Sequence, residues 1–163
     1  MELKILSILN GCLLSDIIII GFTMSNIIHS NYLVKWYQNL RLSAVIMDTL
    51  ILVIGILIAE YLYPLFFSQF HLMWFLLLVL CVQIIHDILF YFLFSQFSPK
   101  QSFIMDLFQK YAIESGWKAI LGDSVMIIMA TLFSFMFQRF SQKINIISLI
   151  VMVYVMPFFL YIQ

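Results

Sequence analysis

Charged side chains are scarce in this chain: they make up 10% of its 163 residues, whereas 64% are hydrophobic. A water-soluble domain of this length keeps a large part of its surface in water and cannot hide that much apolar area. The excess of apolar side chains therefore requires an apolar solvent, which a lipid bilayer provides. The eight basic and eight acidic residues cancel and form no basic stripe, which argues against a nucleic-acid partner.

Cysteines and catalytic motifs are scarce as well. The two cysteines, Cys12 and Cys81, lie inside apolar stretches without metal-ligand spacing, so we expect small buried side chains. The chain has no Gly-x-Ser-x-Gly elbow, no His-Glu-x-x-His motif and no Gly-rich phosphate loop. Residues 121–123 are close to the Gly-x-Gly-Asp motif of intramembrane aspartyl proteases, but Ile120 stands where the first glycine belongs. An enzyme is therefore the least supported class of function.

Long apolar segments, by contrast, are abundant. A helix needs about 20 apolar residues to cross the hydrocarbon of a bilayer. Five segments meet this requirement: 4–23, 42–62, 72–94, 118–137 and 144–162. The alternating pattern of a membrane β-barrel is absent. The sequence therefore predicts one all-α membrane domain, residues 1–163, with about five transmembrane helices, of which the first, a retained span, is the least apolar.

Two connecting segments are predicted to form short amphipathic helices. Around residues 32–40 and 103–112, apolar side chains recur at the spacing of one helical face, so each helix is expected to lie flat at the level of the lipid headgroups. The side of the membrane that holds them carries five of the eight basic residues, which are Lys35, Arg41, Lys100, Lys110 and Lys118. The excess of positive charge places this side in the cytoplasm and the N-terminus outside.

Acidic side chains occur where they are costly, inside the apolar segments. One aspartate falls within each of the first four: Asp16, Asp48, Asp87 and Asp123. An aspartate at the centre of a span costs roughly 2.5–3.5 kcal/mol on the insertion scale, so four of them require a reason. At about 1.5 Å of rise per residue, all four lie about 8–10 Å from the cytoplasmic boundary. The sequence therefore predicts one layer of carboxyl groups.

Gln83 and His86 accompany the third of these acids. Gln83 shares a helical face with Asp87, whereas His86 is expected to point toward a neighbouring helix. Four adjacent carboxylates in a poorly solvated site need something to offset their charge, and bound protons, a divalent cation, or Arg41 and Lys118 are the candidates. The predicted ion- or proton-binding site comprises Asp16, Asp48, Asp87, Asp123, His86 and Gln83, with the four aspartates as the candidate metal ligands.

The acids also repeat along the chain. The first and third are 71 residues apart, and the second and fourth are 75 apart. Residues 44–49 overlay residues 119–124 at the same offset of 75. We therefore expect two parallel repeats, 4–66 and 72–137, related by an axis along the membrane normal, with an additional C-terminal span at 144–162.

Three stretches of the chain carry a resemblance to known proteins: residues 40–48, 60–64 and 83–91. They are similar to uncharacterised small membrane proteins of giant algal DNA viruses, over about residues 32–137. The resemblance implies a host membrane or an internal membrane of the virion, with virion proteins or further copies of the chain as partners. It implies no activity, because none is established for that family.

Two functions from different classes follow from these patterns. A channel or transporter for protons or divalent cations would use the acid layer and would need a polar cavity that joins it to one face or both. A structural membrane protein, for example of a viral inner membrane, would instead seal the acids against hydrogen-bonding groups of neighbouring helices. No cofactor other than a divalent cation is implied by either function.

Overall fold

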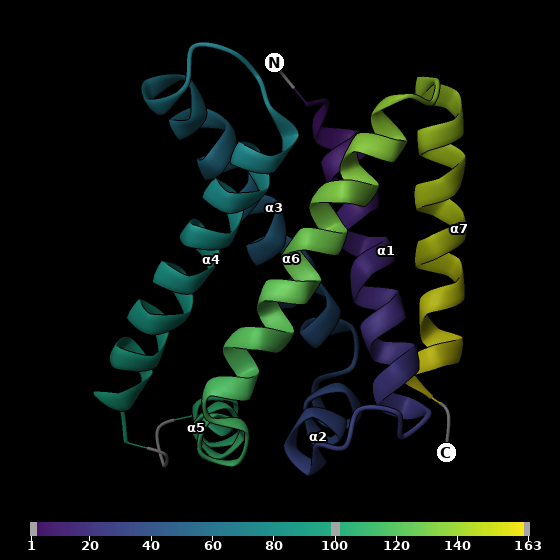
Figure 1. Ribbon diagram of the computed structural model, residues 1–163. Helices are drawn as coiled ribbons and strands as arrows, with labels where there is room; N and C mark the ends of the chain where they lie inside the picture. Colours follow the sequence, from purple (N-terminus) through teal and green to yellow (C-terminus); the bar gives the residue numbers. More distant parts are fainter. Residues whose placement is uncertain (1–2, 99–101, 162–163) are drawn as a thin grey trace.

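The computed structural model describes residues 3–98 and 102–161, and these residues form seven α-helices and no strand (Figure 1). In chain order the helices are α1 (Ile5–Met24), α2 (Asn31–Leu40), α3 (Leu42–Phe66), α4 (Leu72–Ser95), α5 (Phe103–Ser115), α6 (Trp117–Gln138) and α7 (Gln142–Leu160). Five of them, α1, α3, α4, α6 and α7, are long and apolar enough to cross a membrane. The predicted all-α helical bundle is confirmed.

The five long helices match the predicted segments closely. Only α3 differs by more than two residues, because it continues past residue 62 through Pro64 to Phe66. A proline in the last turn of a helix forfeits a single backbone hydrogen bond and is tolerated there. The spans contain 19 to 25 residues, so at about 1.5 Å per residue they are about 28–38 Å long, enough to cross roughly 30 Å of hydrocarbon. Position 162, the predicted end of the last span, lies outside the described residues.

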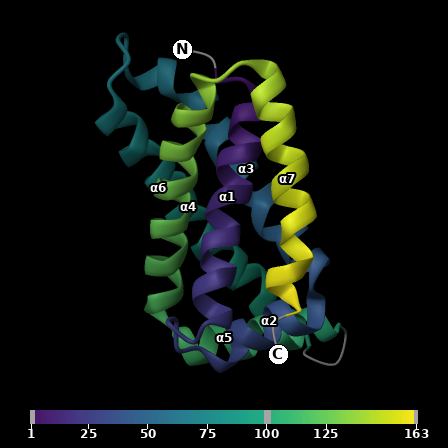
Figure 2. The same cartoon turned by 90° about the vertical axis from the view of Figure 1, so that its right-hand side faces the viewer.

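α1 is the central helix of the bundle (Figure 2). It packs against α6, α7 and α3, and half of its most apolar stretch is buried inside the protein, the largest share of any span. The prediction that the first segment is the least apolar is wrong, because the most apolar stretch of α6 has a lower mean hydropathy. The polar side chains of α1 are accommodated because they face other helices and not lipid.

α4 lies at the periphery and has few buried side chains. Those that are buried, Phe75, Val79 and Gln83, all lie in its first half. Cys81 is exposed on this helix, so the prediction that both cysteines are buried holds for Cys12 alone. The reason is that α4 is covered by neighbours along one narrow stripe, and the rest of its apolar surface is left for lipid.

Small side chains allow α1 and α6 to lie very close together. Ser7, Gly11 and Ser15 fall four residues apart on one face of α1, and all three are buried. A Cβ atom added to Gly11 would lie 2.4 Å from Oγ and 2.5 Å from the backbone nitrogen of Ser134 on α6, so glycine alone fits there. The Ser15 hydroxyl donates a hydrogen bond of 2.9 Å to the carbonyl of Met126 across the same interface. Such contacts hold helices together where lipid is as apolar as their side chains.

Two buried asparagines attach the last helix to this pair. Asn10 Nδ2 donates hydrogen bonds to the backbone and side-chain oxygens of Asn145, at 2.9 and 3.0 Å. Asn145 Nδ2 in turn donates to the carbonyl of Phe137 in the last turn of α6 and to that of Phe140 in the turn that follows it. These two residues, which no pattern in the sequence marked, fix α7 against both α1 and α6.

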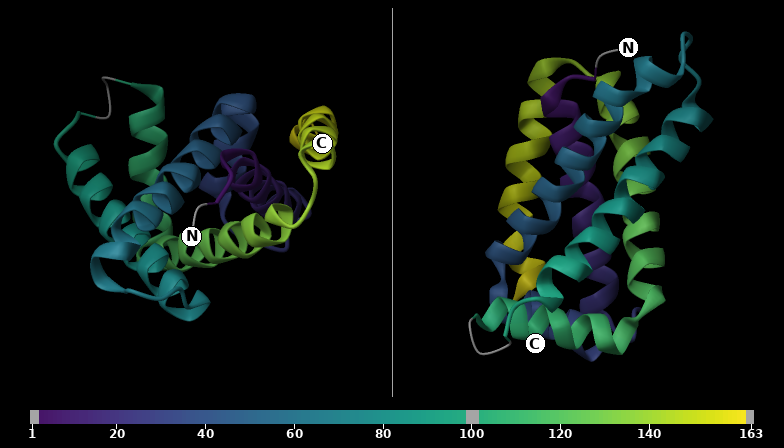
Figure 3. Two further views of the ribbon diagram at one scale, coloured as in Figure 1. Left: turned by 90° about the horizontal axis from the view of Figure 1, so that it is seen from above. Right: turned by 90° about the vertical axis from the view of Figure 1, so that its left-hand side faces the viewer.

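The two short amphipathic helices lie flat across one end of the bundle, which we call the α2/α5 side (Figures 1 and 3). Part of the apolar face of α2 turns into the bundle, because Tyr37 is only 1% exposed. The first turn of α1 lies at the opposite end of the molecule (Figure 1). Of the five basic residues predicted for the α2/α5 side, four belong to α2, α5 and the residues that begin α3 and α6, and Lys100 lies outside the described residues.

Each flat helix leads into the next span through one residue of positive φ. Arg41 joins α2 to α3 with a φ of 49°, and Gly116 joins α5 to α6 with a φ of 52°. The two junctions are 75 residues apart in the chain. Residues with a Cβ atom rarely adopt this backbone conformation, so contacts with the surrounding residues must stabilise it at Arg41.

Replacing Gly11 by alanine should destabilise the protein, because the added methyl group meets the backbone of α6 and the two helices must separate. Overpacking of this kind costs about 1–3 kcal/mol. Gly122, which has no atom within 4 Å of an added Cβ, provides the matched control, and its replacement by alanine should leave stability unchanged or raise it by up to about 1 kcal/mol. Unfolding free energies in detergent micelles would check this, and equal effects of the two substitutions would contradict the close approach of α1 and α6.

Candidate functional site

The four aspartates lie on four different spans at nearly one level of the bundle. Asp16 and Asp87 each precede the end of their helix, α1 or α4, by eight residues, and Asp48 and Asp123 each follow the start of α3 or α6 by six. At about 1.5 Å of rise per residue, these positions are about 9–12 Å from the helix ends on the α2/α5 side.

The charges of this layer raise the pKa values of two tyrosines on the flat helices. Burial raises the pKa of the Tyr37 hydroxyl on α2, and the charges of all the acids except Asp87 raise it further, that of Asp48 most. Burial also raises the pKa of Tyr111 on α5, and the charges of all the acids except Asp16 add to this effect. Each tyrosine is therefore within electrostatic range of three of the four acids, and the layer lies directly behind the two flat helices.

Asp16 is the most deeply buried of the acids, with none of its surface exposed. The Tyr37 hydroxyl donates to Asp16 Oδ1 at 3.3 Å and the Thr49 hydroxyl donates to Oδ2 at 3.5 Å. Both distances are long for O–H···O hydrogen bonds, which usually span about 2.5–3.0 Å. Within the described ranges, no lysine or arginine forms an ion pair with Asp16 or with any of the other three acids. The partners of this carboxyl group are thus uncharged hydroxyls at long range.

Asp48 accepts a hydrogen bond from Trp36, the residue that precedes Tyr37 on α2. Trp36 Nε1 donates to Asp48 Oδ2 at 3.1 Å. Successive side chains of α2 therefore contact acids on two different spans, α1 and α3. The polar tips of Tyr and Trp are suited to this position, because each residue packs its ring into the bundle and still reaches a polar partner.

Asp87 has its partners on its own helix. Gln83 Nε2 donates to Asp87 Oδ1 at 2.7 Å, in agreement with their predicted shared face. The prediction that His86 reaches a neighbouring helix is wrong. Its Nδ1 lies 3.2 Å from the same carboxylate oxygen, and its ring stacks on Phe90 with a centroid distance of 5.1 Å, which turns it along α4. Oδ2 of Asp87 is buried without a hydrogen-bond partner in the described part of the chain.

The hydroxyl side chains next to the acids in the sequence have different hydrogen-bond partners. Thr49, next to Asp48 in the chain, reaches across to Asp16 on α1. Ser15 and Ser124 instead donate to backbone carbonyls, those of Met126 and Ile120. The layer therefore contains fewer side-chain oxygens than the sequence pattern suggests.

The two candidate basic residues do not neutralise the layer. The Arg41 guanidinium lies over the ring of Tyr161, 4.3 Å from its centroid, and its Nε donates to the carbonyl of Gln38. Lys118 is exposed at the start of α6. The basic residues predicted to offset the carboxylates thus lie at the surface.

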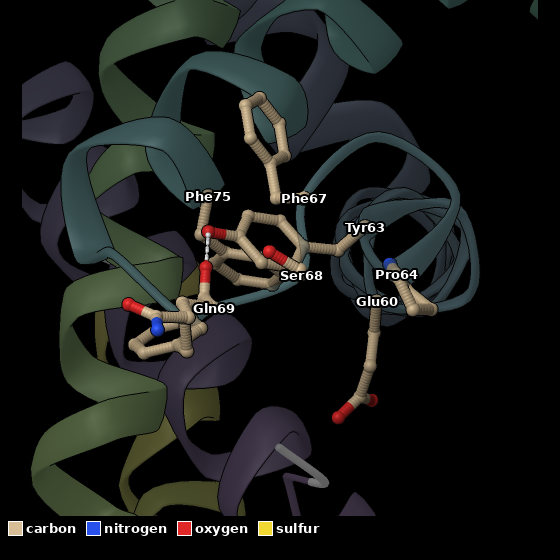
Figure 4. Close-up of a pocket in the computed structure, with 8 residues that line it drawn as sticks. Glu60, Tyr63, Pro64, Phe67, Ser68, Gln69 and Phe75 are labelled. Carbon is tan, nitrogen blue, oxygen red and sulfur yellow. Dashed lines mark hydrogen bonds between the residues drawn. The ribbon is translucent and has the colours of Figure 1, made fainter.

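The described residues contain no group of three or more His, Cys, Asp or Glu side chains placed to hold a metal ion. Two cavities lie elsewhere. One, of about 140 Å³, is at the α3–α4 turn on the opposite end, where the Tyr63 hydroxyl donates to the carbonyl of Gln69 and Glu60 lines the rim (Figure 4). The other surrounds the start of α2, beside Lys35 and Glu114. Neither is lined by an acid of the layer.

Glu114 ties the two flat helices together over this layer. Its carboxylate, on α5, accepts hydrogen bonds from the Ser30 hydroxyl at 2.7 Å and from the backbone nitrogens of Asn31 and Tyr32 at 3.3 and 3.1 Å. These groups are at the N-terminus of α2, where unpaired N–H groups and the helix dipole favour an anion. No pattern in the sequence marked Glu114 as a functional residue.

Trp36 and Tyr37 are the functional candidates that the sequence analysis missed. Both lie within the segment 32–40, which was predicted only as an amphipathic helix. One signal was available. Two adjacent aromatic residues with polar tips occur on a helix that directly precedes an acid-bearing span.

No protein-family model, curated protein or solved structure matches the chain. Its function must therefore be inferred from the arrangement of its own residues.

Acidification should loosen the N-terminus of α2. Partial desolvation tends to raise the pKa of Glu114, but its three hydrogen bonds and the charge of Lys35 lower it overall. Because the folded pKa is the lower one, the stabilisation is complete above the ordinary glutamate range and is lost as the pH falls through the folded value. Relative to the intrinsic exchange rate at each pH, the protection of the Asn31 and Tyr32 amides against hydrogen exchange should fall in that acidic range. The Glu114→Gln variant should exchange faster at neutral pH and lack this acid-dependent step, and a variant that retained the step would contradict this role of Glu114.

Proposed function

We propose that this integral membrane protein binds protons at its layer of carboxyl groups and passes them across the membrane as a channel or transporter. The observation that carries the proposal is Asp16, which is fully buried at the centre of the bundle with two long contacts to hydroxyls and no basic partner in the described chain. An isolated carboxylate in such surroundings is very unfavourable. A bound proton removes the charge without any further ligand.

A proton fits the layer better than a divalent cation does. Ca²⁺ takes six to eight oxygen ligands, and Mg²⁺ requires near-octahedral geometry. No three candidate side chains among the described residues are arranged for such a role, whereas a proton needs one carboxyl oxygen and one acceptor. The proton-binding residues in this proposal are Asp16, Asp48, Asp87 and Asp123, with Gln83 and His86 as partners of Asp87.

The proposal includes the internal repeat, 4–66 and 72–137. In it, Asp16 and Asp48 form the acid pair of the first half, and Asp87 and Asp123 form that of the second. Support comes from the matched junctions at Arg41 and Gly116 and from equivalent packing, since α1 contacts α3 as α4 contacts α6. The fifth span, α7, has no counterpart in this scheme.

The orientation and location also belong to the proposal. The excess of basic residues favours a cytoplasmic α2/α5 side. The resemblance to membrane proteins of giant algal viruses favours a host membrane or an internal membrane of the virion, with virion proteins or a second copy of the chain as partners.

A structural role is the second candidate, and a specific observation favours it. Two of the acids are covered by hydrogen-bond donors of neighbouring helices, Asp16 by Tyr37 and Asp48 by Trp36, and the two cavities described above do not reach them. In that case the carboxyl groups would serve to join helices, and no ion would cross.

Proton flux into liposomes distinguishes the two functions. The purified protein would be reconstituted with a pH-sensitive dye inside the vesicles, and a potassium diffusion potential would drive protons inward. The test variant replaces the four aspartates by asparagine, which keeps the size and hydrogen-bonding capacity of each side chain and removes its acidity. The control variant replaces Asp106 by asparagine, because this acid lies outside the layer and pairs with Lys110 at the surface.

The proposal expects flux above that of empty vesicles for the wild-type protein and the Asp106→Asn control, and a loss of roughly tenfold or more for the fourfold variant. Thermal unfolding would show that all three proteins are folded. Equal flux in the wild type and the fourfold variant, or no flux in the wild type, would contradict proton transport and favour the structural role.

A further inference from the structure

The cavity at the α3–α4 turn is lined by a cluster of aromatic rings (Figure 4). Tyr63 belongs to the last turn of α3 and Phe75 to the first turns of α4, and Phe67 and Phe70 come from the segment between the two helices. The ring centroids of Phe67, Phe70 and Phe75 lie 4.9, 5.6 and 5.6 Å from that of Tyr63. Four rings thus gather around one small space.

These rings differ from an ordinary aromatic belt. Aromatic side chains at the ends of spans usually anchor a helix among the lipid headgroups. Tyr63 and Phe75, however, are only 7% and 1% exposed, so they face the interior of the turn. The Tyr63 hydroxyl donates to the carbonyl of Gln69 at 3.1 Å and accepts from the backbone nitrogen of His71 at 2.9 Å, which holds the turn around its ring.

Glu60 is the only charged residue among the described residues that line this cavity. It extends from the same helix as Tyr63 (Figure 4). Glu60 Oε1 accepts a hydrogen bond from the backbone nitrogen of Leu3, and within the described ranges no basic side chain forms an ion pair with this carboxylate. A carboxylate and the faces of aromatic rings both attract a cation. The lining therefore has the charge and the ring types of a cation site.

The size of the cavity limits the ligand to a small group. Its volume is about 140 Å³, whereas pockets for drug-sized ligands have about 300–1,000 Å³. An apolar cavity of about 150 Å³ is known to hold a benzene molecule, and a trimethylammonium group is of comparable size. Exposed residues of the lining, which are Pro64, Ser68 and Gln69, leave the cavity open to the surface.

The hydrogen bonds of the turn favour a cation that needs none. The Tyr63 hydroxyl and the carbonyl of Gln69 are already paired with each other, and one oxygen of Glu60 is used by Leu3. A primary ammonium group would need acceptors for its three N–H groups. A quaternary ammonium group has no N–H group, and its positive charge is spread over methyl groups that pack against aromatic rings.

We propose that this cavity binds a quaternary ammonium group, which could be supplied by the headgroup of a choline lipid or by a free compound such as choline. The proposal goes beyond proton handling and does not depend on it, because the cavity lies at the opposite end of the bundle from the acid layer.

The first test uses choline with the full-length protein in maltoside micelles. Saturation-transfer nuclear magnetic resonance of the choline methyl signal would report binding, with empty micelles as the blank. We expect saturable binding that tetramethylammonium abolishes by competition. Ethanolamine, and the neutral analogue of choline in which carbon replaces the nitrogen, should compete roughly tenfold or more weakly, because one lacks the methyl groups and the other lacks the charge.

Two variants assign the binding to this cavity. Glu60→Gln removes the charge and keeps an oxygen that can accept from Leu3, and it should weaken choline binding roughly tenfold, whereas Asp106→Asn at the far surface should not. Phe70→Leu removes one ring and should weaken binding roughly threefold. Phe66→Leu is its control, because Phe66 is exposed on α3 and does not line the cavity.

A competition experiment distinguishes the two sources of the ligand. Phosphatidylcholine, added to the micelles in place of tetramethylammonium, should displace choline if the site accepts a lipid headgroup, and phosphatidylglycerol should not. Displacement by phosphatidylcholine supports a lipid ligand. Retention of choline in its presence supports a free quaternary ammonium compound, and both results support the site.

Three outcomes would overturn the proposal. They are a choline signal equal to that of empty micelles, equal competition by the neutral analogue, and binding that neither Glu60→Gln nor Phe70→Leu weakens. If thermal unfolding shows that Glu60→Gln does not fold, Phe70→Leu and the series of ligands decide. Absence of proton flux in liposomes would contradict the proposed function and leave this site standing, so the two failures are distinguishable.

Discussion

The cost of an uncompensated charge inside an apolar bundle is the constraint on which the site depends. Asp16 has no exposed surface and no basic partner in the described chain. The free-energy cost of desolvating an ionised carboxylate exceeds the free energy gained from two long hydrogen bonds with hydroxyl groups. The surrounding structure follows this constraint, because α2 lies flat across the end of the bundle and directs Tyr37 and Trp36 at Asp16 and Asp48. One face of α2, which the sequence marks only as an amphipathic element, thus contacts the acids of the interior.

The central position of α1 depends on packing more than on hydropathy. Lipid tails are as apolar as leucine side chains, so the helices gain little from hiding apolar surface from one another. Gly11 brings α1 and α6 within backbone contact, and the Asn10–Asn145 pair attaches α7. This tight centre buries Asp16 completely, because the acid is carried by the span with the largest buried share. The polar content of α1 is therefore a consequence of its place in the bundle.

The sequence predicts the spans, the flat helices and the common depth of the acids, because run length, helical periodicity and the rise per residue determine these features. It does not predict which side chains meet across helices. His86 turns along its own helix to Asp87 and Phe90, and Tyr37 points inward, because rotation of one helix against another is set by packing that hydropathy does not encode. The small-residue spacing of Ser7, Gly11 and Ser15 was a readable signal for the α1–α6 contact.

The central claim, that the buried carboxyl group of Asp16 carries a proton, is tested most directly by infrared spectroscopy of the protein in lipid at neutral pH. Aspartate labelled with carbon-13 identifies the carbonyl stretch of a protonated aspartic acid, which shifts on exchange into D₂O. The account predicts such a band in the wild-type protein and its loss in the Asp16→Asn variant, with Asp106→Asn unchanged. Absence of the band in the wild type, with only ionised carboxylate absorption, would contradict it.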